Sequence, residues 1–276
     1  MNIVLINEDI DRFKDKYDFV DKAFKFNQQT NPNAAFYYIT NNPRPIEGVE
    51  VHSVSDYEDK DCRLLEQHFT NLNSVPPELE FAWIKRWIIL RNFLTKTVKP
   101  PILYSDNDVL LFTSISEWPQ QVTGAEYSLS ENASPHTNCM NNAAGIEAFA
   151  NYILSIYIDR GAEFNKFKSI YERMQANKSP GGVGDMMLWT HFSRRGLFPN
   201  AIKDISQIFN ESESFDHNIH TTNNFWREDG KYKKIIFKEG VPYCQTVDSD
   251  KLIKFHTLHF QGGAKSKMRK ILQQKL

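Results

Sequence analysis

The chain alternates between short, continuous apolar runs and longer stretches in which apolar residues recur at helical spacing. Runs rich in branched and aromatic residues predict buried strands, and they fall at residues 2–6, 34–40, 49–54, 102–112, 122–129 and 252–260. Helical spacing predicts helices at residues 16–26, 78–94, 146–157 (extended, or followed by another, through 174) and 186–192. This alternation of the two patterns predicts an α/β fold.

Two further features refine this picture. Residues 231–245 predict a hairpin with Glu239 and Gly240 in its turn. Pro76 and Pro77 mark the start of the strongest helix. On this helix and the next one, aromatic side chains at helical spacing are expected in the core: Trp83, Trp87, Phe149 and Tyr152. The sequence contains no repeat, low-complexity tract or linker, which predicts a single domain.

Composition narrows the function classes. The chain has 276 residues, 41% of them hydrophobic, and a formal net charge of -1, so nucleic acid is not an expected partner. Three distant cysteines form no C-x-x-C pair, which argues against a zinc site and fits a reducing compartment. The first apolar run is too short for a signal sequence, and no run reaches the roughly 18 residues of a membrane span. We therefore expect a cytoplasmic protein.

The run at 102–112 is interrupted by Asp106, Asn107 and Asp108. Carboxylates beside buried strands are costly unless a positive group meets them. Two carboxylates at positions i and i+2 can bind one hard cation, Mg²⁺ or Mn²⁺, whose remaining ligands a diphosphate can supply. The alternative is a polar turn between two strands.

A third ligand is expected from the segment that begins at His256. His259 ends an apolar strand and is followed by Gly262, Gly263 and Lys265, so an imidazole can reach the metal and an ammonium the phosphate oxygens. His256 is the weaker candidate because it lacks glycines at the same offset. A packed surface histidine is the alternative explanation for His259.

These motifs resemble the GT-A glycosyltransferases, especially the family 8 galactosyl- and glucosyltransferases of bacterial surface glycans. The resemblance implies a Rossmann-type mixed sheet flanked by helices, in one domain over residues 1–276, with a nucleotide-binding half near 1–130 and an acceptor half near 131–276. It also implies Mn²⁺ (or Mg²⁺) on Asp106, Asp108 and His259. The donor residues that it implies are Arg86 with neighbouring Lys85, Asp106, Gly262 and Lys265, and we add Asn7 at the end of the first strand.

Four segments are also similar to a less-characterised group of bacterial glycosyltransferases. They are Ser134-Pro135-His136, 181–186 (GGVGDM), 215–219 (FDHNI) and 258–262 (LHFQG). This resemblance implies a role in surface polysaccharide synthesis.

Asp185 follows three glycines at the start of a predicted helix, where an acid is favourable without any further role. In family 8 a D-Q-D triplet in this region binds the transferred sugar, whereas here Met186 and Met187 follow Asp185. Asp185 is therefore interpreted either as a ligand of the sugar in a retaining enzyme or as the general base of an inverting one.

Acceptor or sugar contacts are assigned to His136, Gly182, Asp216 and His217, and Trp226 is a candidate to stack on a sugar ring. The alternative for this region is a solvated loop with a partly buried tryptophan, which fits His220 better.

The sequence thus predicts a metal-dependent, hexosyltransferase-like enzyme with a nucleotide-diphosphate sugar, a UDP-sugar first, and a glycan or glycolipid acceptor. The basic tail is interpreted as a solvated helix or, if the acceptor is a glycolipid, as a contact with an anionic membrane surface at the inner face through Lys265, Lys267, Arg269 and Lys270. A sugar-1-phosphate nucleotidyltransferase is one alternative, although 7–9 (Asn-Glu-Asp) stands where its glycine-rich loop would be. A catalytically silent nucleotide-sugar-binding protein is the other. Donor sugar, base, acceptor, stereochemical outcome and oligomeric state stay open.

Overall fold

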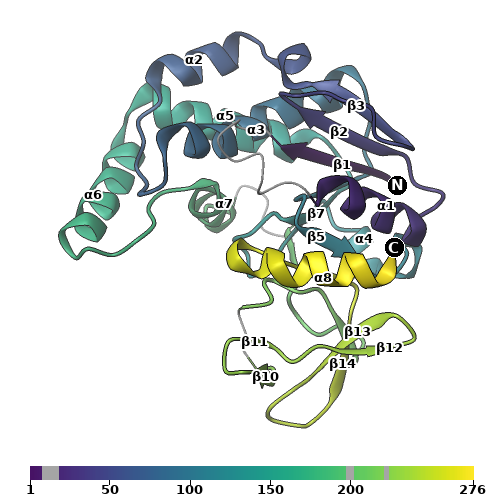
Figure 1. Cartoon of the computed structure of the whole chain (residues 1–276). Helices are drawn as coiled ribbons and strands as arrows, with labels where there is room; N and C mark the ends of the chain where they lie inside the picture. Colours follow the sequence, from purple (N-terminus) through teal and green to yellow (C-terminus); the bar gives the residue numbers. More distant parts are fainter. Residues whose placement is uncertain (8–18, 197–201, 221–223) are drawn as a thin grey trace.

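The computed structural model describes residues 1–7, 19–196, 202–220 and 224–276. Its centre is a mixed sheet with the strand order β3-β2-β1-β4-β7-β6-β8. The strands are β1 (Asn2–Asn7), β2 (Phe36–Thr40), β3 (Val49–Ser53), β4 (Ile102–Ser105), β6 (Tyr127–Leu129), β7 (Thr137–Met140) and β8 (Ile202–Asp204). The predicted α/β fold with a mixed sheet between helices is confirmed (Figure 1).

Strand direction changes in the middle of this sheet. Strands β3, β2, β1 and β4 are parallel, and β7 is antiparallel to β4. The carboxyl end of β4 therefore lies beside the beginning of β7, and beside the carboxyl end of β1. Ligands in open α/β sheets bind outside the carboxyl ends of strands where the order reverses, so this edge is where a site is expected.

Helices cover both faces of the sheet. The long helix α3 (Pro77–Lys96) and α5 (Ala144–Leu154) pack on one face, and α1 (Val20–Thr30) and α8 (Lys265–Lys275) lie on the other (Figure 1). Side chains alternate along β1 as a strand requires: Val4 and Ile6 join the core with α3, whereas Ile3 and Leu5 join the core with α1. The remaining α-helices of the described residues are α2 (Lys60–His68), α4 (Gln120–Thr123), α6 (Ala162–Ala176) and α7 (Asp185–Arg194).

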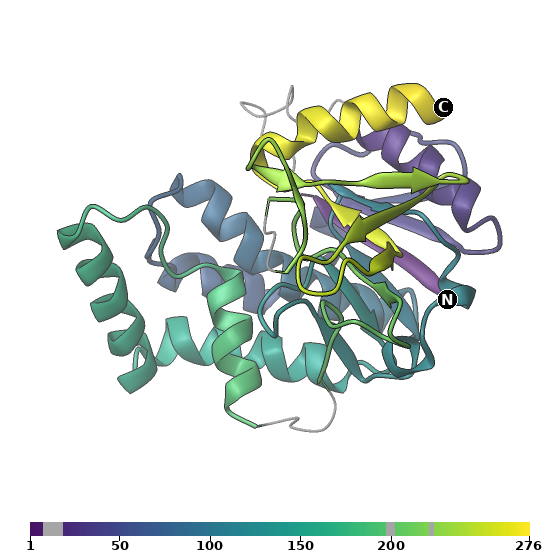
Figure 2. The same cartoon turned by 90° about the horizontal axis from the view of Figure 1, so that it is seen from below.

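Small sheets extend the molecule beside the main one (Figure 2). Strand β15 (Thr257–His259) pairs with β5 (Val109–Leu111). This pairing brings His259 next to the acidic segment 106–108. Strands β12 (Ile236–Lys238), β13 (Val241–Gln245), β14 (Leu252–Phe255) and β9 (Glu213–Ser214) form a second sheet, and β10 (Arg227–Glu228) pairs with β11 (Tyr232–Lys233). The predicted hairpin turn at Glu239 and Gly240 connects β12 to β13 and is confirmed.

Three details differ from the sequence predictions. Residues 122–129 are not one strand, because the helical turn α4 that follows Pro119 takes up the first two of them before β6 begins. The run 252–260 divides at His256 into β14 and β15, which pair with different partners. Trp83 is 36% exposed rather than in the core, whereas Trp87 is completely buried. The predicted start of the first helix, at residues 16–18, lies outside the described residues, as do Glu8 and Asp9.

No helix in the described part of the chain combines the length and the apolar character that crossing a membrane requires.

Candidate metal and nucleotide site

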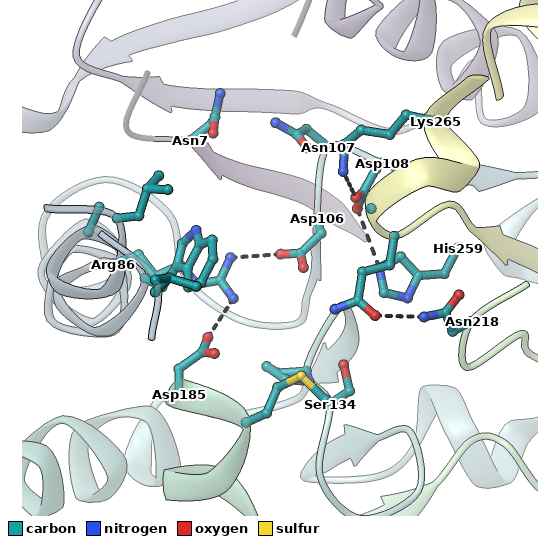
Figure 3. A pocket seen from close by; sticks show the side chains of 18 of the residues that line it. Asn7, Arg86, Asp106, Asn107, Asp108, Ser134, Asp185, Asn218, His259 and Lys265 are labelled. Atoms are coloured by element: carbon teal, nitrogen blue, oxygen red, sulfur yellow. Dashed lines mark hydrogen bonds and ion pairs between the residues drawn. The ribbon is translucent and has the colours of Figure 1, made fainter. Parts of the chain in front are cut away.

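A cavity of about 990 Å³ opens at the carboxyl ends of β1 and β4. Eight predicted site residues line it, from five separate parts of the sequence (Figure 3). They are Asn7, Arg86, Asp106, Asp108, Asp185, His259, Gly262 and Lys265. The structure therefore brings most of the predicted donor and metal residues to one place.

The acidic triplet is the connection between β4 and β5. The amide of Asp106 donates to the carbonyl of His136 (2.9 Å), and the amide of Val109 donates back to the Asp106 carbonyl (3.2 Å). The Asp108 carbonyl accepts from the Phe260 amide (2.9 Å). These bonds fix a turn that leaves the main sheet, as the turn interpretation expects, and this turn is compatible with carboxylates that bind a cation.

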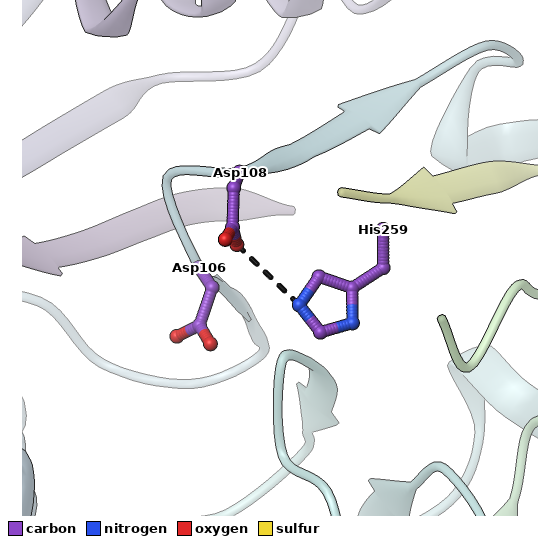
Figure 4. Close-up of side chains that lie close together, drawn as sticks. All are labelled: Asp106, Asp108 and His259. Atoms are coloured by element: carbon purple, nitrogen blue, oxygen red, sulfur yellow. Dashed lines mark ion pairs between the residues drawn. The ribbon is translucent and has the colours of Figure 1, made fainter. Parts of the chain in front are cut away.

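Asp106, Asp108 and His259 each offer a ligand atom, and these atoms lie within 4.8 Å of one another (Figure 4). Nδ1 of His259 lies 2.6 Å from the His217 carbonyl, an acceptor, so it carries the proton and Nε2 is left toward Asp108, 3.4 Å away. A histidine held in this way through its other nitrogen is the arrangement found around protein-bound metals. Two carboxylates and one imidazole therefore fit a divalent cation such as Mn²⁺ or Mg²⁺.

Lys265 forms an ion pair with Asp108 across this cluster. Burial opposes ionisation of Asp108, but the Lys265 ammonium and the His259 imidazole outweigh it and hold the pKa of Asp108 well below its usual range. Burial also works against charge on His259, and the Asp108 carboxylate overcomes it and raises the pKa of His259. The Asp108 carboxylate therefore stays ionised in the folded chain, and a divalent cation on Nε2 of His259 would replace the proton that Asp108 favours there.

Arg86 joins this cluster to Asp185. Its guanidinium donates to Asp106 (2.9 Å) and to Asp185 (2.6 Å), and Tyr104 adds a hydrogen bond to Asp106 (2.8 Å). Trp87 donates its indole N–H to the same oxygen of Asp185 (3.2 Å). Burial disfavours the charge on Arg86, but the neighbouring acids raise its pKa well above the usual value. Arg86 therefore positions two acids that are distant in sequence.

Two predicted acceptor contacts are corrected by their burial. His136 is completely buried, both ring nitrogens lie within hydrogen-bond distance of protein oxygens, and its ring stacks on His259 with 4.0 Å between centroids. Asp216 is also completely buried, with one oxygen on Lys233 (2.7 Å) and the other on the His259 amide (3.1 Å). Both support His259 from behind and reach no solvent.

Three other predicted contacts lie away from this cavity. His217 bonds Ser130 (3.0 Å) through Nδ1 and gives its carbonyl to His259. Lys85 is buried on another side of α3 and pairs with Glu58 (2.7 Å), which corrects its assignment to the donor. Trp226 is exposed and bonds Asp250, not a residue of the cavity.

Gly182 is required for packing. A Cβ at this position would lie 2.2 Å from the Leu72 carbonyl oxygen, and the Val183 amide donates to that same oxygen (2.8 Å). The close approach holds the glycine segment 181–184 in front of α7. Gly182 lies outside the first cavity, in the wall of a second one.

The basic helix α8 points partly inward. Lys265 and Arg269 line the cavity, and Lys267 pairs with Glu228 (2.6 Å). Of the four residues of the predicted membrane contact, Lys270 is the exposed one that neither lines the cavity nor forms an ion pair among the described residues.

Two residues that the sequence analysis did not assign to the site, although they lie in or next to the segment 215–219, line the cavity. Asn218 bonds Gln261 (2.6 Å) at the rim, and His220 lines the cavity although a solvated loop was the favoured interpretation. Asn218 and Asp216 are two apart, yet only Asn218 reaches the cavity, because the segment is irregular and does not alternate like a strand. No periodic signal in the sequence could have sorted these side chains.

Replacing Lys233 by Met is expected to destabilise the protein by about 3 kcal/mol, because the buried charge of Asp216 loses its ion-pair partner. Urea denaturation at neutral pH measures this loss. The matched control is Lys234→Met, at the exposed neighbouring position, which should change stability by less than about 0.5 kcal/mol. Equal free energies of unfolding for the two variants would show that the Lys233–Asp216 ion pair does not stabilise the folded protein.

Glu80 is a completely buried acid that the sequence analysis did not single out. Nδ2 of Asn73 donates to its Oε2 (2.9 Å), and Oε1 has no hydrogen-bond partner among the described residues. Burial, followed by the charge of Asp185, raises its pKa from 4.5 to about 8, against the opposing effects of Arg86 and Asn73. The Glu80 carboxyl is therefore mostly protonated at neutral pH.

The raised pKa predicts that stability falls as pH rises from about 4.5 to about 8, because the unfolded chain releases the proton first. Glu80→Gln should remove this loss, so the stability of the variant relative to the wild type should be higher at pH 8 than at pH 5 by roughly 3 kcal/mol. Urea denaturation of both proteins at pH 5 and pH 8 measures the difference. Parallel pH profiles for the two proteins would contradict the prediction.

The chain was compared with known proteins. No family model and no curated protein sequence matches it. Among solved structures it is similar to the apo form of mouse xyloside xylosyltransferase 1, with 12% identity, a TM-score of 0.42, and coverage of 74% of this chain and 84% of that one. It is also similar to the PaToxG glycosyltransferase, with 14% identity, a TM-score of 0.33 and 72% of each chain covered. Both are glycosyltransferases by name. Neither belongs by its name to family 8, and at these scores the likeness does not assign a function.

Proposed function

We propose that the protein is a metal-dependent glycosyltransferase that takes its sugar from a nucleotide-diphosphate sugar. The observation that carries the proposal is the convergence of Asp106, Asp108 and His259 with Lys265 in one large cavity at the end of β4. This donor set suits a hard divalent cation, and the adjacent ammonium suits phosphate oxygens. When bound, the cation would neutralise the diphosphate and make it a better leaving group.

In the proposed reaction, an acceptor hydroxyl oxygen forms a bond to the anomeric carbon of the donor sugar. The bond between that carbon and the diphosphate oxygen breaks, and its electron pair leaves with the diphosphate. Lys265 is placed to move from Asp108 to the diphosphate when the donor and its cation arrive. Arg86 holds Asp106 and Asp185 in place on the two sides of the cavity (Figure 3).

Asp185 is the residue we assign to the sugar or the acceptor. One of its oxygens is bonded to Arg86 and Trp87, and the other makes no hydrogen bond to a described residue. This second oxygen would take the proton of the acceptor hydroxyl in an inverting reaction or bind a sugar hydroxyl in a retaining one. Because the glutamine and the second acid of the D-Q-D triplet are missing after Asp185, the proposal includes both the inverting and the retaining reaction.

Titration with UDP in the presence and absence of Mn²⁺, followed by a screen of nucleotide sugars for hydrolysis, tests the proposal. We expect metal-dependent UDP binding and slow release of free sugar from at least one donor. Metal-dependent binding without turnover of any donor, with or without acceptors, would favour the silent binder. Formation of a nucleotide sugar from a sugar 1-phosphate and a nucleoside triphosphate would favour the nucleotidyltransferase.

A further inference from the structure

A second cavity, of about 600 Å³, lies next to the first. Trp83, Asp185 and Met186 line both cavities and form the partition between them. The rest of its wall comes from α3 and the loop before it, α6, α7, the glycine segment and one residue near β6, and it includes Glu80, Lys166, His191 and Arg194. Asp185 is therefore accessible from two separate spaces.

The charges in this second cavity are unevenly distributed. Lys166 and Arg194 are exposed, and neither forms an ion pair among the described residues. The Lys166 ammonium lies 3.4 Å from the ring nitrogen Nε2 of His191, which is a neutral acceptor. The one other acid of the wall besides Asp185 is Glu80, which is mostly protonated at neutral pH. Two cations thus face a cavity that offers them no carboxylate partner of their own.

We propose that the second cavity binds the acceptor and that the acceptor is an anionic sugar. Its phosphate or carboxylate group would bind Lys166 and Arg194, its ring would lie against Trp83, and its reacting hydroxyl would point to Asp185. This inference rests on the proposed function, because it gives the donor to the first cavity. It also replaces the corrected acceptor contacts at His136 and Asp216.

The exposure of Trp83 supports this assignment. It lies on α3, most of whose other large apolar side chains are buried, and its side chain is shared by two cavities. A large indole face next to polar groups provides an apolar surface for the C–H face of a sugar ring. The anomeric carbon in the first cavity and the acceptor hydroxyl in the second would then meet at the partition, beside the free oxygen of Asp185.

Transfer to three matched acceptors tests the inference: glucose, glucose 6-phosphate and glucuronic acid. We expect at least one of the two anionic acceptors to be used with a KM about tenfold or more below that of glucose. The double variant Lys166→Gln/Arg194→Gln should remove this preference by raising the KM of the anionic acceptor about tenfold. A preference for glucose 6-phosphate or for glucuronic acid distinguishes a phosphate from a carboxylate as the recognised group.

The matched control is Lys168→Gln/Arg173→Gln, which removes the same charge from the exposed surface of α6, outside both cavities. It should keep the preference. The affinity for UDP with Mn²⁺ is measured in the same samples, so that a damaged donor site or an unfolded variant is recognised. Equal use of the three acceptors by the wild-type protein, or an unchanged preference in the Lys166/Arg194 variant, would overturn the inference and leave the proposed function intact.

Direct binding keeps the inference testable without turnover. Calorimetric titration with glucose 6-phosphate and with glucuronic acid should show binding that the Lys166/Arg194 variant loses and the control variant keeps. If no donor is hydrolysed and UDP does not bind, the proposed function fails, and the titrations still decide whether the second cavity takes an anionic sugar.

Discussion

Asp108→Asn is expected to abolish metal-dependent binding of UDP and hydrolysis of the donor, with a loss of more than about 100-fold in metal affinity. Asp108 is the central group of the cluster, since it faces both His259 and Lys265. The amide keeps the shape of the side chain and removes the charge that balances the Lys265 ammonium and a divalent cation. Calorimetric titration of Mn²⁺ and UDP, with and without each other, measures the loss.

The control for Asp108→Asn is Asp229→Asn. Asp229 is exposed in the turn before β11, where a positive φ of 52° suits asparagine as well as aspartate. This variant removes the same charge and should bind UDP with Mn²⁺ like the wild type. Circular dichroism shows whether a loss in Asp108→Asn reflects unfolding. Full donor hydrolysis by Asp108→Asn would refute the metal assignment.

The convergence of the candidate metal ligands could be predicted from the sequence because the order and separation of the motifs are informative together, although each motif is weak by itself. The acids interrupt an apolar strand, and the histidine stands three residues before Gly262, whose φ of 59° is a conformation that glycine adopts without strain. The distance between the acids and the histidine could not be predicted from the sequence. The pairing of β15 with β5 provides it, by placing His259 opposite Val109.

The errors on the acceptor side have one physical cause. His136 is predicted from its place after Ser134 and Pro135 in a segment similar to other glycosyltransferases, and Asp216 from the polar cluster in a predicted loop. Their burial depends on tertiary packing, which places one ring under His259 and pairs one carboxylate with Lys233. Trp83 is the opposite case, because it is expected in the core and is partly exposed. Helical spacing identifies the face of a helix that packs on the core, but it does not show where that face extends beyond the sheet.

Asp185→Asn is expected to lower sugar transfer by about 100-fold to 10,000-fold while UDP and Mn²⁺ still bind. The asparagine oxygen can still accept from Arg86 and Trp87, so the partition between the cavities should keep its shape. The variant loses the negative charge that would take a proton from the acceptor or hold a sugar hydroxyl. The rate of transfer to the best of the three acceptors, with the donor that the nucleotide-sugar screen identifies, is compared with the affinity for UDP in the same variant.

Asp61→Asn is the matched control, because Asp61 also lies in the first turn of a helix and pairs with an arginine of α3, Arg91 (2.9 Å). It is remote from both cavities, and each variant loses a comparable interaction with its helix N-terminus, worth about 0.3–1 kcal/mol. Normal transfer by Asp185→Asn would remove Asp185 from the reaction and make it a helix-start residue held by Arg86. If Asp185→Asn loses transfer and UDP affinity to the same extent, Asp185 maintains the shape of the donor cavity instead. A residue that acts on the sugar or the acceptor would lower transfer and leave the affinity for UDP unchanged.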